Sequence, residues 1–425
     1  MRTVDLRSLA LIEPLGDAGI GTYTHELAEA LVAAGVTADV YATEWAWSRS
    51  LPRTHRLYPV IGSALFHQRD ILDGPGLALA DPPPAAAGRG EGAPAPPSLW
   101  SAGRSAARSA FLTFELALWL RRRGYDAVWT QWPAIGAPFP HFWRTCRRLG
   151  LRLIHTVHNV LPHERGASDE RRYRAVYDAS DVLLVHSRAA NASLSGVFPD
   201  AGAKSLVSWH GTYTSYPRAP EARARLRAQL GLDAGTPLAL FFGAVRPYKN
   251  VDAVLYALRG APDLDLVLLV AGVESGYPGP PVADQLARTR RLAVELGVDA
   301  RVRFLAGPFS FAGTAEIFEA ADLVVLPYLE SFGSGQLLLA MTFGKWIAAT
   351  AVGGMDEYLN AYPRGFILRE LAPGSLADAL RELAHAIRAQ GDRALAWDGG
   401  EFSWRQIVAA LLPRLRSQLS PRAPA

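Results

Sequence analysis

Short runs of apolar residues alternate with longer stretches rich in alanine, leucine and arginine along the whole chain. Runs that are apolar at nearly every position are typical of strands buried on both faces of a parallel sheet. The stretches between them have the length and composition of helices that would cover those faces. We predict a strand before Gly16 and further strands at 36–41, 127–129, 153–156, 182–185, 238–242, 266–271, 302–304, 323–326 and 346–350.

Two such sets of strands and helices in succession predict an α/β fold with two Rossmann-like, doubly wound domains. The length of 425 residues agrees, because it exceeds the ~250–300 residues at which one core stops growing. We place the boundary in the proline-rich stretch 217–220, since a helix-like segment that ends at Gly231 and a new strand follow it. The expected domains are 1–217 and 218–403.

Composition narrows the class of protein. Hydrophobic residues make up 49% and charged residues 20%, which excludes a disordered or fibrous chain. The single cysteine, Cys146, excludes an intrachain disulfide and a cysteine-rich zinc site. A net charge of +4 is too small an excess to predict a nucleic-acid partner.

The N-terminal residues do not look like a signal peptide, because Arg2, Asp5 and Arg7 interrupt any apolar core. No apolar run approaches the ~20 residues that cross a bilayer. We therefore expect a cytoplasmic protein. The apolar stretch 111–120, followed by Arg121–Arg123, leaves two interpretations open: a core helix, or peripheral contact with the inner face of a membrane.

A glycine-rich segment, Gly16–Tyr23, separates the first predicted strand from a helix. Gly19 and Gly21 would let the backbone approach a ligand, and the helix N-terminus favours an anion. The dinucleotide pattern G-x-G-x-x-G is not met, because Thr24 stands at its third glycine. A tight turn without a ligand explains this segment about as well.

A histidine-rich segment, residues 155–164, follows the strand at 153–156 with the sequence HTVHNVLPHE. The carboxyl ends of parallel strands are where open α/β sheets bind ligands. The histidine spacing is not that of a zinc motif and no cysteine supports one. An ordinary core or capping histidine accounts for one of the three, and for a set this dense beside Asn159 and Glu164 we favour a polar site.

Two segments of the second half suit a diphosphate. In FFGAVRPYKN, residues 241–250, Gly243 ends a strand and Arg246 and Lys249 supply a fork-shaped and a point cation. In the segment 327–341 a loop leads into an apolar helix whose free N–H groups would cradle an anion. That helix start carries Ser334, Gly335 and Gln336, and a later glycine loop carries Glu357. The competing interpretations are solvated surface cations and a plain strand–loop–helix connection.

Together these segments resemble a retaining glycosyltransferase of the GT-B fold, family 4, over nearly the whole chain. AGIGTYTHELAEAL is similar to the family's N-terminal glycine loop, and HTVHNVLPHE to the segment that supplies its active-site histidine. FGAVRPYKN is similar to its G-x-x-R-x-x-K element, and ESFGSGQLLLAMTFGKWIAATAVGG to its nucleotide-sugar segment.

The resemblance implies roles for individual residues. Arg246 and Lys249 would hold the donor diphosphate, and His158 would contact the donor sugar near the reacting carbon. Gly19 and Gly21 would let the N-terminal loop approach the phosphates or the acceptor. The terminal helix at about 404–420 would pack back on the first domain, although packing on its own domain is the alternative.

The sequence also departs from the family pattern. Glu330 matches the first glutamate of the motif, which touches the donor sugar, but the loop is one residue longer, so Ser331 competes for that position. Leu339 stands where the family has a ribose-binding glutamate, as in some polysaccharide-type members. Glu357 is a candidate replacement carboxylate.

The expected activity is retaining transfer of a sugar from a UDP- or GDP-sugar to a hydroxyl of a glycan, lipid-linked or small-molecule acceptor, as in polysaccharide biosynthesis. We expect no cofactor and no metal ion, since cations and helix N–H groups would stabilise the leaving nucleotide. Two alternatives remain: a nucleotide-sugar 2-epimerase of the same fold, and a catalytically silent partner subunit, which Leu339 suggests.

Overall fold

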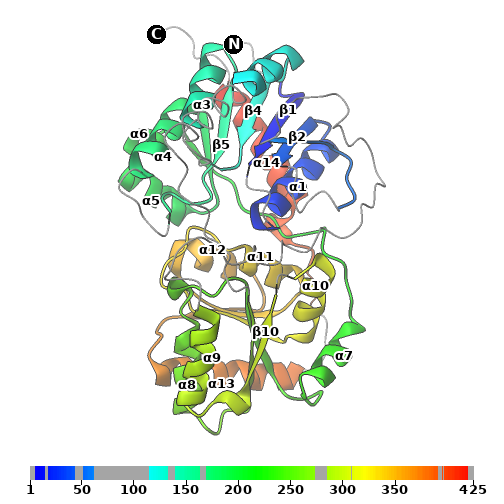
Figure 1. The fold of residues 1–425 in the computed structure, drawn as a ribbon, viewed down its shortest axis with the longest axis vertical. Coiled ribbons are helices and arrows are strands. Elements are labelled where there is room, and N and C mark those ends of the chain that lie inside the picture. The colour runs from blue at the N-terminus through cyan, green and yellow to red at the C-terminus, as the bar shows by residue number, and fades with distance from the viewer. Residues whose placement is uncertain are drawn as a thin grey trace, which may run out of the picture. The chain divides into compact units, whose positions relative to one another are not determined.

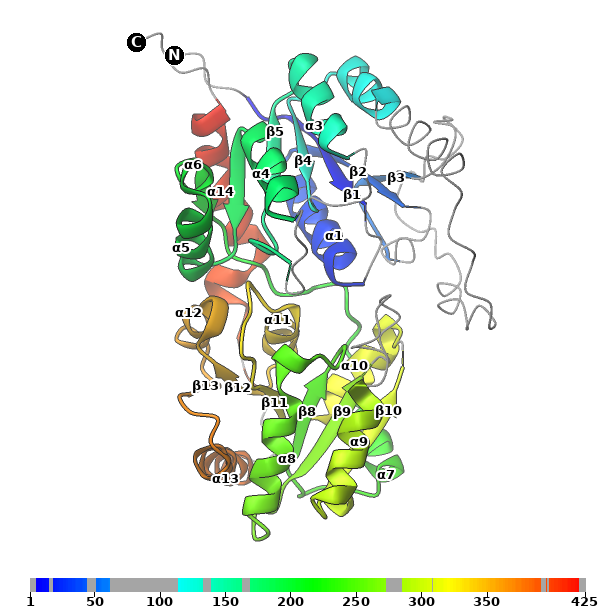
Figure 2. The same ribbon diagram turned by 60° about the vertical axis from the view of Figure 1, so that its left-hand side comes forward.

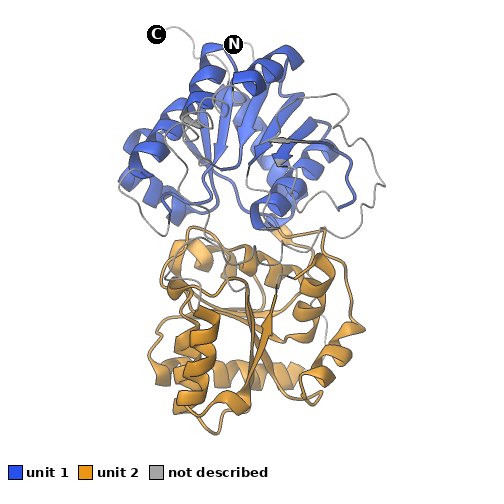
Figure 3. Ribbon diagram, in the orientation of Figure 1, with its two compact units in different colours: residues 1–211, 401–425 blue, residues 212–400 orange. Residues whose placement is uncertain are grey.

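The computed structural model describes residues 5–14, 18–43, 51–61, 114–132, 139–162, 169–272, 285–307, 309–390, 395 and 397–419. The chain divides into two units (Figure 3). The first unit comprises Met1–Gly211 with Glu401–Ala425, and the second comprises Thr212–Gly400. The division therefore lies slightly before the stretch 217–220 that the sequence indicated.

The first unit is built on a 7-stranded sheet in which every strand pair is parallel, in the order β3-β2-β1-β4-β5-β6-β7 (Figure 1). Its strands are β1 (Ser8–Glu13), β2 (Thr37–Thr43), β3 (Arg56–Ile61), β4 (Ala127–Thr130), β5 (Leu153–Thr156), β6 (Val182–Val185) and β7 (Ser205–Val207). The strand order reverses between β1 and β4, which is the arrangement of a doubly wound sheet.

Helices cover this sheet. They include α1 (Ala18–Ala33), α3 (Phe139–Arg148), α4 (Asp169–Ala179), α5 (Arg188–Val197), α6 (Pro199–Gly202) and α14 (Trp404–Leu419). The terminal helix α14 lies beside α1 (Figure 2), where Leu411 and Leu415 join Leu27 and Leu31 in one buried cluster. The apolar stripe of α14 thus completes the core of the first unit, as a helix with one buried face should.

The second unit has a 6-stranded parallel sheet in the order β10-β9-β8-β11-β12-β13 (Figure 2). Its strands are β8 (Leu238–Phe242), β9 (Val267–Gly272), β10 (Val302–Ala306), β11 (Leu323–Leu326), β12 (Trp346–Thr350) and β13 (Gly365–Leu368). Its α-helices are α7 (Ala222–Gln229), α8 (Val251–Gly260), α9 (Gln285–Glu295), α10 (Phe311–Ala320), α11 (Gly335–Thr342), α12 (Met355–Leu359) and α13 (Pro373–Gln390). Short 3₁₀ turns include η3 (Pro247–Lys249) and η5 (Val352–Gly354).

The two sheets confirm the predicted α/β class with two doubly wound units. Residues 114–123 are helical, and Leu116, Ala117 and Leu120 are buried, so the apolar stripe of this stretch faces the protein interior. Within the described ranges, no helix combines the length and the hydropathy that crossing a membrane requires.

Candidate active site

Polar side chains follow the carboxyl ends of most strands in the first unit's sheet. Because parallel strands end at the same edge, residues far apart in the sequence gather there. These residues are Glu13 at the end of β1, Gln131 just after β4, His158 after β5, His186 after β6 and His210 after β7. The parallel sheet thus brings these polar side chains together at one edge.

Tyr23 of α1 is the centre of an aromatic cluster at this edge. Its buried ring lies 4.8 Å from the ring centroid of His158, 5.1 Å from that of His186 and 4.9 Å from that of His210. The Trp404 ring of α14 lies 5.2 Å from it. Edge-on contacts between such rings are favourable and hold their orientations. The cluster therefore fixes the direction in which His158 points.

His158 is uncharged at neutral pH. Burial lowers the pKa of this histidine well below its usual value, and the nearby His186 and His210 lower it further. Its Nε2 lies 3.4 Å from the Oε1 of Gln131. A neutral imidazole has one N–H donor and one acceptor nitrogen, so His158 can orient a hydroxyl group but contributes no positive charge.

His186 and His210 each use one ring nitrogen in a hydrogen bond to a backbone carbonyl oxygen. Nδ1 of His186 donates to the carbonyl oxygen of Ser208 at 2.9 Å, and Nδ1 of His210 donates to that of Gly211 at 2.8 Å. Burial lowers the pKa of His186 to about 4 and that of His210 to about 3. These two histidines were not predicted from the sequence, although each follows a buried or half-buried strand just as His158 does.

His155 is a core residue. It lies within β5, is fully buried, and its Nδ1 is 2.8 Å from the hydroxyl of Thr130. It is therefore the ordinary core histidine that was expected among the three. His163 and Glu164 lie outside the described residues.

Gly19 and Gly21 belong to the first turn of α1, so they are helical residues and not part of the preceding loop. Gly19 is exposed and Gly21 is buried. Residues 15–17, which precede the helix, lie outside the described ranges. The expected approach of an N-terminal glycine loop to a ligand therefore rests on this first helical turn.

In the second unit, two polar side chains converge on Gly243 at the end of β8. A β-carbon at this position would lie 3.0 Å from Nε2 of Gln336 and 3.5 Å from Nζ of Lys249. Gly243 also has a φ of +96°, which residues other than glycine rarely adopt. The residue is thus glycine for two reasons, backbone conformation and the space that Lys249 and Gln336 occupy.

Lys249 is a cationic residue whose side chain is almost completely buried. It ends the turn η3, is only 6% exposed, and its Nζ lies 5.7 Å from the centroid of the Tyr328 ring. Burial lowers the pKa of Lys249 to about 8, and the positive charge of Arg246 contributes to that shift. Among the described residues, no carboxylate forms an ion pair with this ammonium group. A buried cation next to a second cation is what an anionic ligand would stabilise.

The start of α11 lies near the end of β8, since Gln336 of its first turn reaches Gly243. Ser334 is the N-cap, and its hydroxyl accepts a hydrogen bond from the backbone N–H of Leu337 at 3.3 Å. A β-carbon on Gly335 would lie 3.0 Å from the hydroxyl of Tyr213. The remaining N–H groups of this first turn have no helical acceptor, so the turn can bind an anion.

The loop before α11 contains Glu330 and Ser331, the two residues that compete for the first position of the family motif. Glu330 is exposed, whereas Ser331 is buried, and its hydroxyl both donates to the carbonyl of Gly333 at 2.9 Å and accepts from its N–H at 3.2 Å. A β-carbon on Gly353 would clash with the carbonyl oxygen of Ser331, so the glycine loop packs directly on this segment. Glu357 is partly exposed on α12.

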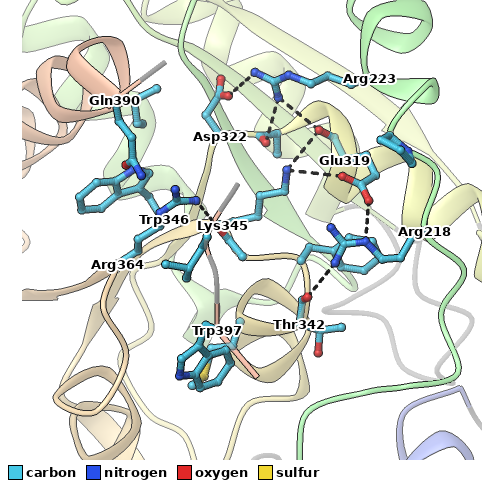
Figure 4. Close-up of a pocket in the computed structure, with 17 residues that line it drawn as sticks. Arg218, Arg223, Glu319, Asp322, Thr342, Lys345, Trp346, Arg364, Gln390 and Trp397 are labelled. Atoms are coloured by element: carbon cyan, nitrogen blue, oxygen red, sulfur yellow. Dashed lines mark hydrogen bonds and ion pairs between the residues drawn. The ribbon is translucent and has the colours of Figure 1, made fainter. Parts of the chain in front are cut away.

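A polar pocket of about 450 Å³ lies at the opposite, amino-terminal edge of the same sheet (Figure 4). Asp322 precedes β11, Trp346 begins β12 and Arg364 precedes β13, and all of them line the pocket. Arg223 points at Asp322, and their ion pair measures 2.6 Å.

The two carboxylates of this pocket each lie close to cations. The Glu319 carboxylate is 2.9 Å from Nε of Arg218 and 4.0 Å from Nζ of Lys345. Burial lowers the pKa of Lys345 to about 8, while Glu319 acts in the opposite direction. Lys345 therefore has the counter-ion that Lys249 lacks among the described residues, and the contrast singles out Lys249 as the lysine prepared for a ligand.

Comparisons with known proteins agree with this geometry. Residues 222–388 match the family model "Glycosyl transferases group 1", and residues 18–201 match "Glycosyl transferase 4-like domain". The D-inositol 3-phosphate glycosyltransferase of Mycolicibacterium vanbaalenii is 31% identical over 64% of this chain. The protein of that name from Mycobacterium avium is 34% identical over 64% of this chain. The alignments span 62% and 66% of those relatives.

Solved structures share the fold. The sucrose-phosphate synthase of Thermosynechococcus elongatus has a TM-score of 0.67 at 21% identity, covering 97% of this chain and 99% of its own. Anabaena HepE, solved in complex with UDP and glucose, has a TM-score of 0.61 at 15% identity, covering 96% and 99%. The two family models lie on the two units, and the chain therefore belongs to the group 1 glycosyltransferases and has their GT-B fold.

Proposed function

We propose that this protein transfers a sugar from a nucleotide-diphosphate-sugar to a hydroxyl group of an acceptor, and that its second unit binds the donor. The observation that carries the proposal is the buried ammonium of Lys249, which lies beside Arg246 and has no ion-pairing carboxylate among the described residues. A diphosphate would supply the missing negative charge. Anabaena HepE, which has the same fold, binds UDP in its solved complex, and this supports the proposal.

The chemistry of sugar transfer suits this cluster. Breaking the sugar–phosphate bond leaves a negative charge on the nucleotide and a positive charge on the sugar ring. Arg246, Lys249 and the N–H groups at the start of α11 would stabilise the leaving diphosphate as that charge develops. In this proposal the two side-chain cations supply the stabilisation, and no metal ion is needed for this step.

We assign the sugar contact to His158, the residue at the position of the family's active-site histidine. Its neutral ring, held by Tyr23 and Gln131, can orient a sugar hydroxyl near the reacting carbon. We propose retention of configuration by front-side attack of the acceptor hydroxyl. Glu330 is exposed on its loop, and we propose for it a sugar contact.

The acceptor is proposed only as a class: a hydroxyl of a glycan, of a lipid-linked sugar or of a small molecule. The relatives named D-inositol 3-phosphate glycosyltransferase support the small-molecule alternative. The burial of Leu116, Ala117 and Leu120 supports a core role for the helix at 114–123 over contact with a membrane.

A second candidate function is that of a catalytically silent partner subunit. Leu339 is buried on α11 at the position where the family has a ribose-binding glutamate, and its aliphatic side chain accepts no hydrogen bond. Under this hypothesis the nucleotide-binding cluster remains while turnover is absent. The third possibility, 2-epimerisation, would act on the same donor.

Calorimetry with UDP, GDP, ADP and their glucose conjugates tests the donor site. We expect one nucleotide to bind, and Arg246→Ala and Lys249→Ala to weaken its binding at least about 10-fold, since each removes a charge-assisted contact. If no nucleotide or nucleotide sugar binds the folded protein, the donor assignment is wrong. Analysis of the sugar products after incubation distinguishes a glycosyltransferase, a 2-epimerase and a catalytically silent subunit from one another.

A further inference from the structure

We propose that His25, Glu29 and His55 form a binding site for a divalent transition-metal ion of the zinc type. The three residues lie in the first unit, and none of them belongs to the cluster around His158 or to the proposed donor site. One ligand atom from each residue lies within 4.8 Å of the others. The site is independent of the proposed function.

The local fold brings the three side chains together. His25 and Glu29 are one helical turn apart on α1, which places both on the same face of the helix. His55 comes from the segment that leads into the edge strand β3. Its ring stands edge-on to the ring of His25, with 5.2 Å between the centroids. Both histidines are buried, with exposures of 4% and 3%.

Two imidazoles and a carboxylate are a ligand set that zinc accepts, with a water molecule completing a tetrahedral site. Zinc–nitrogen bonds of ~2.0–2.1 Å place tetrahedral ligand atoms about 3.4 Å apart. Ligand atoms up to 4.8 Å apart therefore need to close by little more than an ångström, which side-chain rotation can supply. Magnesium and calcium are disfavoured because they prefer oxygen ligands.

An independent observation at His25 points to a ligand. Its Nδ1 is buried and has no hydrogen-bond partner among the described residues. Buried polar atoms are nearly always paired, and leaving one unpaired is unfavourable. A metal ion bound at this nitrogen would provide the partner that the protein does not.

Hydrogen bonding alone explains only part of this arrangement. Glu29 accepts from the backbone N–H of Thr54 at 2.7 Å and from its hydroxyl at 2.8 Å, and its Oε1 lies 2.7 Å from Nδ1 of His55. These bonds fasten α1 to the segment before β3 without any metal. They leave His25 unexplained, whereas a metal site includes it and uses Thr54 to orient the carboxylate.

The charge of Arg53 is the main feature that opposes a cation here. This residue is buried in the same segment, and its positive charge acts on His25. The Glu29 carboxylate offsets that charge and is itself a ligand. The site is therefore best suited to an ion that binds strongly to imidazole nitrogen, which zinc and cobalt do.

The test uses the 425-residue protein, stripped with a chelator and titrated with cobalt chloride while visible absorption is followed. We expect one ion per chain with the intense bands of tetrahedral cobalt, and the same stoichiometry for zinc by mass spectrometry of the metal. His25→Gln and Glu29→Gln should each weaken binding at least about 10-fold. Glu29→Gln retains an acceptor for Thr54, so it separates metal binding from the hydrogen bonds.

The matched control is His385→Gln, which replaces a histidine of α13 outside the proposed site and should leave binding unchanged. Circular dichroism checks that each variant is folded. If His25→Gln fails to fold, the cobalt spectrum of the unmodified protein still tests whether the metal binds. The proposal is overturned if the stripped protein binds no cobalt or zinc. It is equally overturned if folded His25→Gln and Glu29→Gln bind as the unmodified protein does, because the metal would then be held by other histidines.

Discussion

The ammonium group of Lys249 lies over Gly243, with Nζ only 3.5 Å from where a β-carbon at position 243 would stand. Gly243 follows β8 directly and Lys249 ends the turn η3, so the strand-to-helix connection folds back to put the cation above the strand end. The carboxyl edge of a parallel sheet thereby acquires a positive charge at the place where such sheets bind ligands.

Gly243→Ala should destabilise the protein by about 1 to 3 kcal/mol, because alanine is strained at a φ of +96°. The added methyl would also press on Gln336 and Lys249, so nucleotide affinity should fall. Urea unfolding and calorimetry with UDP measure the two effects. Gly235→Ala is the control, since a β-carbon there would meet no atom within 4 Å apart from its neighbours in the chain. Equal stability of the two variants would contradict the role given to Gly243.

Lys249→Met should stabilise the nucleotide-free protein at neutral pH while abolishing turnover. Lowering a lysine pKa from 10.5 to about 8 corresponds to about 3 kcal/mol of opposition to the charged form. Methionine fills similar space without a charge, so part of that energy is recovered. Thermal unfolding with and without UDP checks this expectation. A variant that is less stable and still active would refute it.

The same shift gives a pH dependence with a defined sign. Because the folded pKa of Lys249 is below the unfolded one, the unfolded chain binds more protons between about pH 8 and pH 10.5. Stability should therefore rise with pH across that window. In Lys249→Met the rise should be smaller, with the contribution of Lys345 remaining. Urea titrations at several pH values measure the difference, and identical slopes would show that the pKa of Lys249 is not shifted.

His158→Ala should lower turnover at least about 10²-fold with little loss of stability, whereas His155→Ala should mainly destabilise. His155 is fully buried within β5, and its removal leaves a cavity and removes the partner of the Thr130 hydroxyl. Since the pKa of His158 is well below its usual value, its removal should not change the shape of the pH–rate profile between pH 6 and 8. If the pH–rate profile of the unmodified protein has a limb near pH 6.5 that is absent in His158→Ala, the conclusion that His158 is neutral would be wrong.

The sequence predicted the central strands and missed three of the four strands at the sheet edges, the exception being β10, which was predicted at 302–304. The strands β3, β7 and β13 are all edge strands, and β7 and most of β13 are only partly buried. Their residues therefore lack the continuous apolar run by which central strands are recognised. The bounds of β5, β6, β8, β11 and β12 were predicted correctly for the same reason.

Arg246 and Lys249 could be proposed from the sequence because they follow an apolar strand in a recognisable motif, and the structure places Lys249 near the end of that strand. His186 and His210 carry the same positional signal, but single histidines are common, and only the sheet order brings them to Tyr23. The pairing of His25 with His55 joins a helix to the segment before an edge strand. No local pattern predicts a contact across that distance in the sequence. The candidates that the sequence did not indicate are thus those brought together by long-range contacts.

Glu319→Gln should destabilise the protein by about 3 kcal/mol, because the buried carboxylate neutralises Lys345 and pairs with Arg218 (Figure 4). Without it, the pKa of Lys345 should fall further, since burial then acts against less opposing negative charge. Urea unfolding at pH 7 measures the loss. The double variant Glu319→Gln/Lys345→Met should recover part of it, because it removes the unpaired cation as well. Additive effects of the two substitutions would show that Glu319 and Lys345 do not interact. Lys345 would then lack the counter-ion that distinguishes it from Lys249.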